Sequence, residues 1–312
     1  MAARALTGTR GALHELDETE LERLARVAER RLAARPLAAT GPHLRERRAG
    51  RGVEFLEFRA WAPGEDPRDI DWRASARTGR LQLRRYRDEA SSDVFLCLDR
   101  SASMGVGDGA KWHLALQLVA SLGYVLLATG NRVALLAFSD DIDAVDPLGR
   151  GRARYSRLLS RLETLVPPRA GGGSCLESCA RQLPAGASAL VVSDFLAPDH
   201  LRRGLDALAA RGGAVRALQV IELDELPLEL GAEDRVVLRD VESGERVQAR
   251  AGHLLDARAQ TRLTDMKRAL AAHCRSRGIA LSTHPAGETW RDAVLRHLGA
   301  TAGLQSGAVP GA

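Results

Sequence analysis

From residue 93 onward, short apolar runs alternate with longer stretches that have the apolar repeat of a helix. Neighbouring parallel strands need a crossover between them, and a helix supplies it. The alternation therefore predicts an α/β domain with a doubly wound, mostly parallel sheet and helices on both faces. The predicted strands cover residues 94–98, 132–138, 189–192, 214–221 and 279–283, and the predicted helices cover residues 110–129, 155–165, 176–183, 199–210 and 290–298.

Two stretches depart from this alternation. Residues 142–145 follow a tight turn, and we expect them to pair back as an antiparallel edge strand. Residues 235–249 hold two extended pieces around Ser243-Gly244, which predicts a β-hairpin. A long helix is expected next, over residues 256–277. Hairpin and helix thus form an excursion from the sheet.

The first 92 residues have a different pattern. Residues 13–35 have the apolar spacing of an amphipathic helix, which Asp17 or Thr19 would cap and Pro36 would end. Residues 53–86 are short extended pieces separated by turns. We divide the chain into an N-terminal amphipathic helix, a region of short strands and turns, an α/β domain with its excursion and a disordered tail, with bounds 1–36, 37–92, 93–298 (excursion 223–278) and 299–312.

Composition argues against a nucleic acid partner and against a transmembrane segment. The formal net charge is +5, but the basic residues are scattered among 40 acidic ones, and aromatic residues make up only 4%. The longest apolar run, residues 114–129, is short of the ~20 residues that span a bilayer. The start of the chain does not have the pattern of a signal peptide. We therefore expect no transmembrane segment, a cytoplasmic location and reduced cysteines, with Cys175 and Cys179 as core residues rather than a metal or redox pair.

The strongest chemical signal lies at the predicted strand ends. Asp99, Ser101 and Ser103 directly follow the strand at residues 94–98. In doubly wound sheets, ligands bind beyond the carboxyl ends of the strands. A carboxylate and two hydroxyls in one tight loop suit an oxygen-seeking cation such as Mg²⁺. The alternative is that Asp99 and Ser101 only cap the next segment, as Asp194 would do after its own strand.

Residues 99–103 read Asp-x-Ser-x-Ser, which resembles the metal-ion-dependent adhesion site motif of von Willebrand factor A domains. In those domains, a hydroxyl from a second loop and an Asp from a third complete the site. Ser174, after three glycines at 171–173, stands where relatives usually carry Thr. The resemblance implies a von Willebrand factor A-like fold and a Mg²⁺ site, or Mn²⁺ or Ca²⁺, open to a carboxylate of a partner. Its ligands would be Asp99, Ser101, Ser103, Ser174 and Asp194.

The segment before this motif resembles a more specific family. Residues 63–66, 69–77 and 78–81 are similar to the signature of the bacterial domain-of-unknown-function-58 family, as is the stretch at 240–245. The resemblance covers roughly residues 35–298. The family commonly occurs beside MoxR-type AAA+ ATPases. It therefore implies such an ATPase as partner, and an adaptor that acts in the assembly or maturation of another complex.

The signature interleaves acidic side chains with arginines, and we expect them to form an ion-pair network with Trp72 as its buried anchor. The network holds Glu65, Asp66, Asp69 and Asp71 against Arg68, Arg73, Arg77 and Arg80. A docking surface for a partner is the main alternative. Catalysis by paired carboxylates is a third, less favoured because each carboxylate has an Arg near enough to keep it ionised.

The non-enzymatic adaptor has three alternatives. Haloacid dehalogenase-like phosphohydrolases need a second Asp two residues after the first, where this chain has Ser101, which cannot act as the general acid. A phosphate-binding loop at residues 105–107 is disfavoured because no Gly-Lys-Ser/Thr follows. A structural domain without any metal is the third. We predict that the protein is not an enzyme.

Overall fold

The computed structural model describes residues 9–34, 54–61, 70–87, 92–167, 174–196, 198–222, 235–239, 241, 244–250 and 257–303. The chain divides into two compact units. One comprises residues 1–41 and 92–312, and the other comprises residues 42–91.

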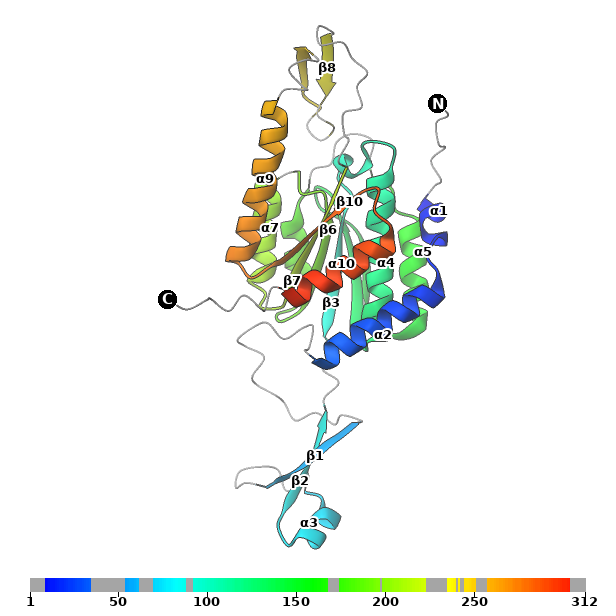
Figure 1. The fold of residues 1–312 in the computed structure, drawn as a ribbon, viewed down its shortest axis with the longest axis vertical. Coiled ribbons are helices and arrows are strands. Elements are labelled where there is room, and N and C mark those ends of the chain that lie inside the picture. The colour runs from blue at the N-terminus through cyan, green and yellow to red at the C-terminus, as the bar shows by residue number, and fades with distance from the viewer. Residues whose placement is uncertain are drawn as a thin grey trace. The chain divides into compact units, whose positions relative to one another are not determined.

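The larger unit contains a six-stranded sheet with the strand order β10-β7-β6-β3-β4-β5 (Figure 1). Its strands are β3 (Asp93–Asp99), β4 (Arg132–Phe138), β5 (Ile142–Gly149), β6 (Ser188–Ser193), β7 (Val215–Ile221) and β10 (Ala280–Pro285). Neighbours pair in parallel except β5, which runs antiparallel to β4 at the edge. The predicted mostly parallel sheet with an antiparallel edge strand is confirmed.

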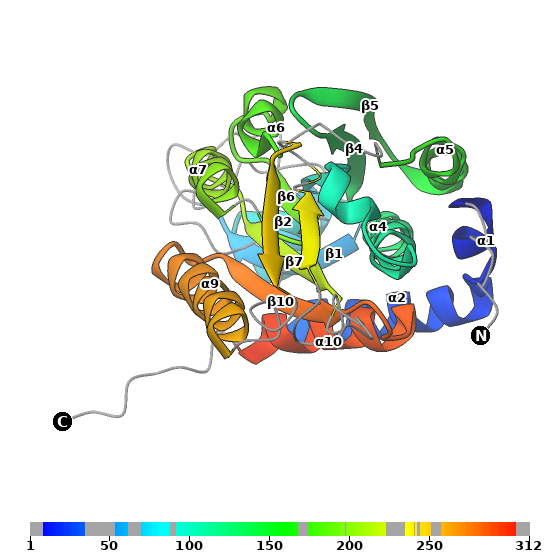
Figure 2. The same cartoon turned by 90° about the horizontal axis from the view of Figure 1, so that it is seen from above.

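Helices cover both faces of this sheet (Figure 2). One face carries α1 (Thr9–His14), α2 (Glu18–Ala34), α4 (Ala110–Ala128), α5 (Gly151–Glu163) and α10 (Trp290–Gly303). The other carries α6 (Leu176–Gln182), α7 (Pro198–Ala209) and α9 (Ala257–Ser276). Side chains alternate along a strand, so Leu96 and Leu98 of β3 pack into the first layer, while Phe95 and Cys97 pack into the second.

The helix α4 is the core element of the first layer. Among the described residues, it alone has the length and apolar composition that would allow a helix to cross a membrane, and most of it is buried inside this unit. It lies close to α5 and β3 because Gly123 has no side chain. A Cβ there would stand 2.5 Å from a methyl carbon of Leu158 and 3.3 Å from one of Leu96.

The N-terminal region was predicted as one continuous helix separate from the α/β domain, and the structure differs on both points. It consists of α1 and α2, with Asp17 accepting a hydrogen bond from the backbone N–H of Thr19 at the start of the second. Leu13 and Leu24 are buried in the same cluster as α4. The Gln117 side chain of α4 donates to the carbonyl of Ala12. These helices therefore belong to the larger unit, because their apolar face is buried there.

The smaller unit pairs β1 (Glu54–Ala60) with β2 (Gln82–Arg87) in antiparallel fashion and adds the short helix α3 (Trp72–Thr78). The prediction of Trp72 as a buried anchor is wrong, since its side chain is 66% exposed. The anchor is polar instead: Ser75 accepts from the backbone N–H of Gln82 and donates to the carbonyl of Asp71. The predicted partners at residues 65, 66, 68 and 69 lie outside the described residues.

Asp71 begins α3, where its carboxylate accepts from the backbone N–H groups of Arg73 and Ala74 at 2.9 and 3.0 Å. We expect Asp71→Ala to lower the free energy of unfolding by about 1 kcal/mol, because both N–H groups lose their acceptor. Urea denaturation checks this value. Asp71→Asn keeps an acceptor oxygen and should recover most of the loss, whereas equal losses in the two variants would contradict the capping role.

The predicted hairpin is present as β8 (Arg235–Arg239) and β9 (Arg246–Arg250), which pair in antiparallel register. The helix predicted as part of the same excursion is α9, and it packs on the sheet instead, because Leu270 and Cys274 are buried in the second layer. The C-terminal prediction needs a correction. The expected disordered tail begins at residue 299, but α10 continues to Gly303, because Leu298 is buried and holds the helix on the sheet. Residues 304–312 lie outside the described residues.

Candidate metal centre

The strand order brings the predicted site residues to one edge of the sheet. From β3 the chain adds β4 and β5 on one side, then crosses to add β6, β7 and β10 on the other. The connections after β3 and β6 therefore leave in opposite directions, and in sheets of this kind ligands bind beyond the carboxyl ends of such a strand pair. Asp99 ends β3, and Asp194 follows the last residue of β6.

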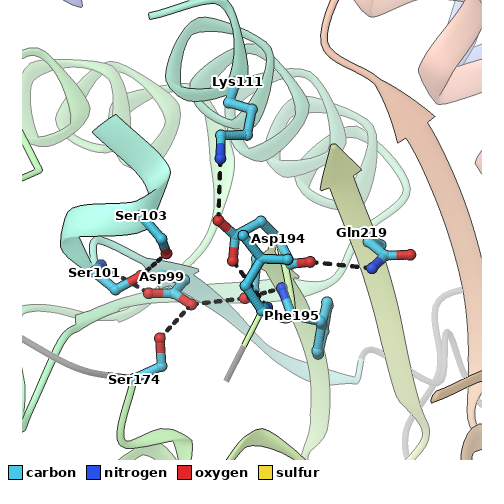
Figure 3. A network of polar contacts seen from close by, with 10 residues as sticks. Asp99, Ser101, Ser103, Lys111, Ser174, Asp194, Phe195 and Gln219 are labelled. Carbon is cyan, nitrogen blue, oxygen red and sulfur yellow. Dashed lines mark hydrogen bonds and ion pairs between the residues drawn. The ribbon is translucent and has the colours of Figure 1, made fainter. Parts of the chain in front are cut away.

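Asp99 lies at the centre of a buried polar cluster (Figure 3). One carboxylate oxygen accepts from the backbone N–H of Ser101 at 2.8 Å. The other accepts from the hydroxyls of Ser174 at 2.9 Å and Ser193 at 2.6 Å. All three donors are neutral, so this buried carboxylate receives hydrogen bonds but no positive charge from them.

Asp194 is oriented by a strained turn. Its neighbour Phe195 has φ of 56°, and it is the one non-glycine residue in the left-handed region among those described. Its N–H donates to the Ser193 hydroxyl, and the N–H of Leu196 donates to one carboxylate oxygen of Asp194. Gln219 of β7 holds the Asp194 carbonyl at 3.0 Å. Strain of this kind persists where the surroundings fix it, and it often marks functional sites.

The remaining oxygens come from two loops. The short 3-10 helix η2 (Ala102–Gly105) follows β3 and places the Ser103 hydroxyl 3.0 Å from that of Ser101. Ser174 lies just before α6 and reaches Asp99 across 75 positions of sequence. Ser101, Ser103 and Ser174 are all buried. The five side chains predicted as ligands therefore lie together, while the glycines at 171–173 lie outside the described residues.

Burial of two carboxylates in one cluster changes their acidity. Burial, and then the charge of Asp194, raise the pKa of Asp99 from 3.8 to about 7, against the hydrogen bonds from Ser193 and Ser101. Burial also raises the pKa of Asp194, against the opposing effect of the Lys111 ammonium. Both carboxylates are thus held in a place where an added cation would stabilise their charged forms.

Capping accounts for only one oxygen of each carboxylate. One oxygen of Asp99 accepts from the N–H two residues on, as does one oxygen of Asp194, which is what local turns require. The second oxygen of each carboxylate instead meets side chains from distant segments, namely Ser174 and Ser193 for Asp99 and Lys111 for Asp194. The alternative that Asp99 and Asp194 only cap the segments after them does not explain these long-range contacts.

The donor set fits a hard cation that takes hydroxyl ligands. The described residues hold no group of three or more His, Cys, Asp or Glu side chains able to bind an ion, so any ion here needs serine oxygens. Two carboxylates and three hydroxyls supply oxygen ligands alone, and these suit Mg²⁺ rather than thiophilic metals. Nearby, the carboxylate of Glu222 lies against Gly107, where a Cβ would stand 2.2 Å from it, and this acidic side chain disfavours a phosphate at residues 105–107.

Three residues of the cluster were missed from sequence. Ser193 bonds Asp99, Gln219 holds the backbone of Asp194, and Lys111 forms an ion pair with its carboxylate. A signal existed for Lys111, because it is one of two lysines among 45 basic residues and lies in the first turn of the long apolar helix α4. Ser193 and Gln219 had no such signal, since polar residues at strand ends are common. The cysteines are free thiols, and Cys179 lies in the core, as expected, whereas Cys175 is only half-buried and belongs to neither core cluster.

Comparison with known proteins gives relatives that lack an assigned role. Uncharacterized proteins of Mycobacterium bovis and Mycobacterium tuberculosis are 31% identical over 201 residues, which is 62% of this chain and 62% of their own length. A crystal structure of the conserved hypothetical protein BatB from Bacteroides thetaiotaomicron matches with a TM-score of 0.44 and 20% identity, and the match covers 68% of this chain and 99% of that one.

The family comparison is more extensive. The sequence model of DUF58, described as a protein of unknown function, matches residues 57–270. The match begins within β1, takes in β2 of the smaller unit and covers most of the sheet with its candidate metal centre. The chain therefore belongs to the DUF58 family.

Proposed function

We propose that Asp99, Ser101, Ser103, Ser174 and Asp194 form a Mg²⁺ site of the von Willebrand factor A type, with Mn²⁺ or Ca²⁺ as alternatives. The observation that carries this proposal is the convergence of two buried carboxylates and three buried hydroxyls from three loops on one point. Burial disfavours the charged forms of these two carboxyl groups, and a divalent ion bound between them would stabilise those forms.

The proposed ligands would have two different roles in the site. Asp99 and Asp194 would supply charge, and the hydroxyls of Ser101, Ser103 and Ser174 would supply neutral oxygens. Because few charged ligands face the ion, it would keep affinity for one further carboxylate. When bound, Mg²⁺ would offer that position to an Asp or Glu of a partner protein. Ser193 and Gln219 would orient the two carboxylates without contacting the ion.

The proposed activity is therefore metal-dependent binding of another protein rather than catalysis. Ser101 stands where a phosphohydrolase needs its general acid, and its buried hydroxyl faces Ser103. As partner we propose the MoxR-type AAA+ ATPase that the family resemblance implies, with the protein as an adaptor in the assembly or maturation of another complex.

Metal binding is tested by thermal unfolding with and without Mg²⁺, Mn²⁺ or Ca²⁺. A ligand that binds only the folded state stabilises it by about 2.7 kcal/mol when the ligand concentration is a hundred times the Kd. We therefore expect the Tm of the wild type to rise. Asp99→Asn should abolish this rise, because it removes the central charged ligand. Asp93→Asn, at the opposite end of β3, is the matched control and should behave as the wild type.

Partner binding is tested with the same variants. We expect the wild type and Asp93→Asn to retain the purified ATPase in a pull-down with Mg²⁺, and Asp99→Asn or added EDTA to release it. An unchanged Tm across millimolar concentrations of all three ions would overturn the metal site. Equal retention of the ATPase by folded Asp99→Asn would overturn the metal-mediated contact.

A further inference from the structure

A lysine side chain is buried inside the candidate metal centre. Lys111 lies in the first turn of α4, its side chain is 1% exposed, and its Nζ is 3.3 Å from Oδ2 of Asp194 (Figure 3). Asp194 is 83 residues away in sequence, and its own side chain is 2% exposed. Lysine is almost never fully buried unless it is paired, so this ion pair accounts for the position of its ammonium.

The two carboxyl groups of the cluster have different partners. Asp99 receives only neutral donors, whereas Asp194 receives the ammonium of Lys111. The Lys111–Asp194 pair lies in a region shielded from water, where electrostatic interactions are strong. The ammonium sits on the same carboxylate that would ligate a divalent ion.

We propose that Lys111 is an internal cation that competes with the divalent ion for Asp194 and thereby weakens metal binding. The inference rests on the proposed metal site. An ammonium and a divalent ion on one carboxylate would repel each other at short range, so binding of the ion must displace Lys111 from Asp194. Lysine suits this role because its ammonium is carried on a flexible four-carbon stem.

Competition gives the site two charge-compensated states. Without metal, Lys111 holds Asp194 in the orientation set by the Phe195 turn, so the carboxylate is not left as an unpaired buried charge. With metal, the ion replaces the ammonium. The affinity for Mg²⁺ is then lower than the ligand set alone would give, because displacing Lys111 is part of every binding event.

The test compares Lys111→Met with Lys267→Met, since these are the two lysines of the chain and Lys267 lies on α9 in the opposite helix layer. Binding of Mg²⁺ is measured by titration calorimetry on the full chain. We expect Lys111→Met to lower the Kd for Mg²⁺ by about tenfold or more, which corresponds to about 1.4 kcal/mol. The metal-free Tm of Lys111→Met should fall, and Lys267→Met should match the wild type in both measurements.

The outcomes separate this inference from the proposed function. If folded Lys111→Met binds Mg²⁺ with the same or a lower affinity than the wild type, the competition is overturned while the metal site stands. If no variant binds any divalent ion, both are overturned.

A second measurement needs no variant. With lysine selectively labelled with ¹³C at Cε, the wild type gives two signals, one from Lys111 and one from Lys267. We expect saturating Mg²⁺ to shift the Lys111 signal and to leave that of Lys267 in place. A Lys111 signal that does not move, in a sample whose Tm has risen with Mg²⁺, would show that the ammonium stays on Asp194 and would overturn the proposal.

Discussion

Replacing Arg154 by alanine is expected to lower the free energy of unfolding by about 3–5 kcal/mol. Arg154, in the first turn of α5, forms a buried ion pair with Asp146 of the edge strand β5. Its guanidinium also donates to the backbone carbonyls of Val133 and Asp146, at 2.9 and 3.2 Å. The alanine variant would leave the Asp146 carboxylate and these carbonyls buried without their donor, which is the costly part of breaking such a pair.

The room for this side chain comes from Gly149, where a Cβ would stand 2.8 Å from Cδ of Arg154. Urea denaturation measures the loss. The matched control is Arg132→Ala, because Arg132 pairs with Asp93 in the same sheet but is 44% exposed. Exposed pairs contribute about 0–1 kcal/mol, so the control should change little. Similar losses in the two variants would show that burial does not govern the strength of these pairs.

Acidification from pH 6.5 to pH 5 is expected to cost the fold about 2 kcal/mol through His297 alone. His297 of α10 is buried, and its Nδ1 lies 3.0 Å from the Ser282 hydroxyl of β10. The same hydroxyl contacts Nε2 of His284, whose Nδ1 faces the carboxylate of Glu288 at 3.2 Å. Burial, then the charges of Arg216 and His284, lower the pKa of His297 from 6.5 to about 3.

The sign follows from proton uptake. Between pH 6.5 and 3 the unfolded chain carries a proton on His297 that the folded protein does not, so stability falls as the pH decreases through this range. Each pH unit costs about 1.4 kcal/mol for one such group. Burial lowers the pKa of His284 as well, so its contribution has the same sign.

His297→Asn removes the titrating ring and keeps a polar atom near Ser282. We expect the stability of this variant to lose less on going from pH 6.5 to pH 5 than that of the wild type, as measured by urea denaturation at each pH. The raised pKa of Asp99 acts in the opposite direction, but it is common to both proteins and cancels in the difference. His14→Asn, at an exposed position of α1, is the control. Parallel curves for wild type and His297→Asn would refute the prediction.

Strands and most helices could be predicted from the local pattern. Residues 132–138 were expected as a strand and form β4. A parallel strand that is covered on both faces needs apolar side chains on both, so it appears in the sequence as a short continuous apolar run. The helix α3 was missed, since the Trp72–Thr78 segment is short and its start signal, Asp71, stands among other charged residues. The break between α1 and α2 was missed for a related reason, because apolar spacing continues across it.

The candidate ligands were also predictable in part. Asp99, Ser101 and Ser103 lie within five residues, and the position of Asp194 after an apolar strand follows from the alternation of strands and helices. Parallel strands end at one edge of a sheet, so a motif after one strand and an Asp after another must approach each other there. Lys111 was not predicted as a member, because a single charge at a helix start is usually solvated.

Local sequence determined which segments are strands and helices and which oxygen-bearing side chains stand at the strand ends, because periodicity and short motifs act over a few residues. Only the tertiary structure decided that Lys111 meets Asp194, that Trp72 is exposed and that His284 and His297 share one buried hydroxyl. Those contacts join positions far apart in the chain or depend on which surface is covered. They follow from how the layers pack, which no short window of sequence contains.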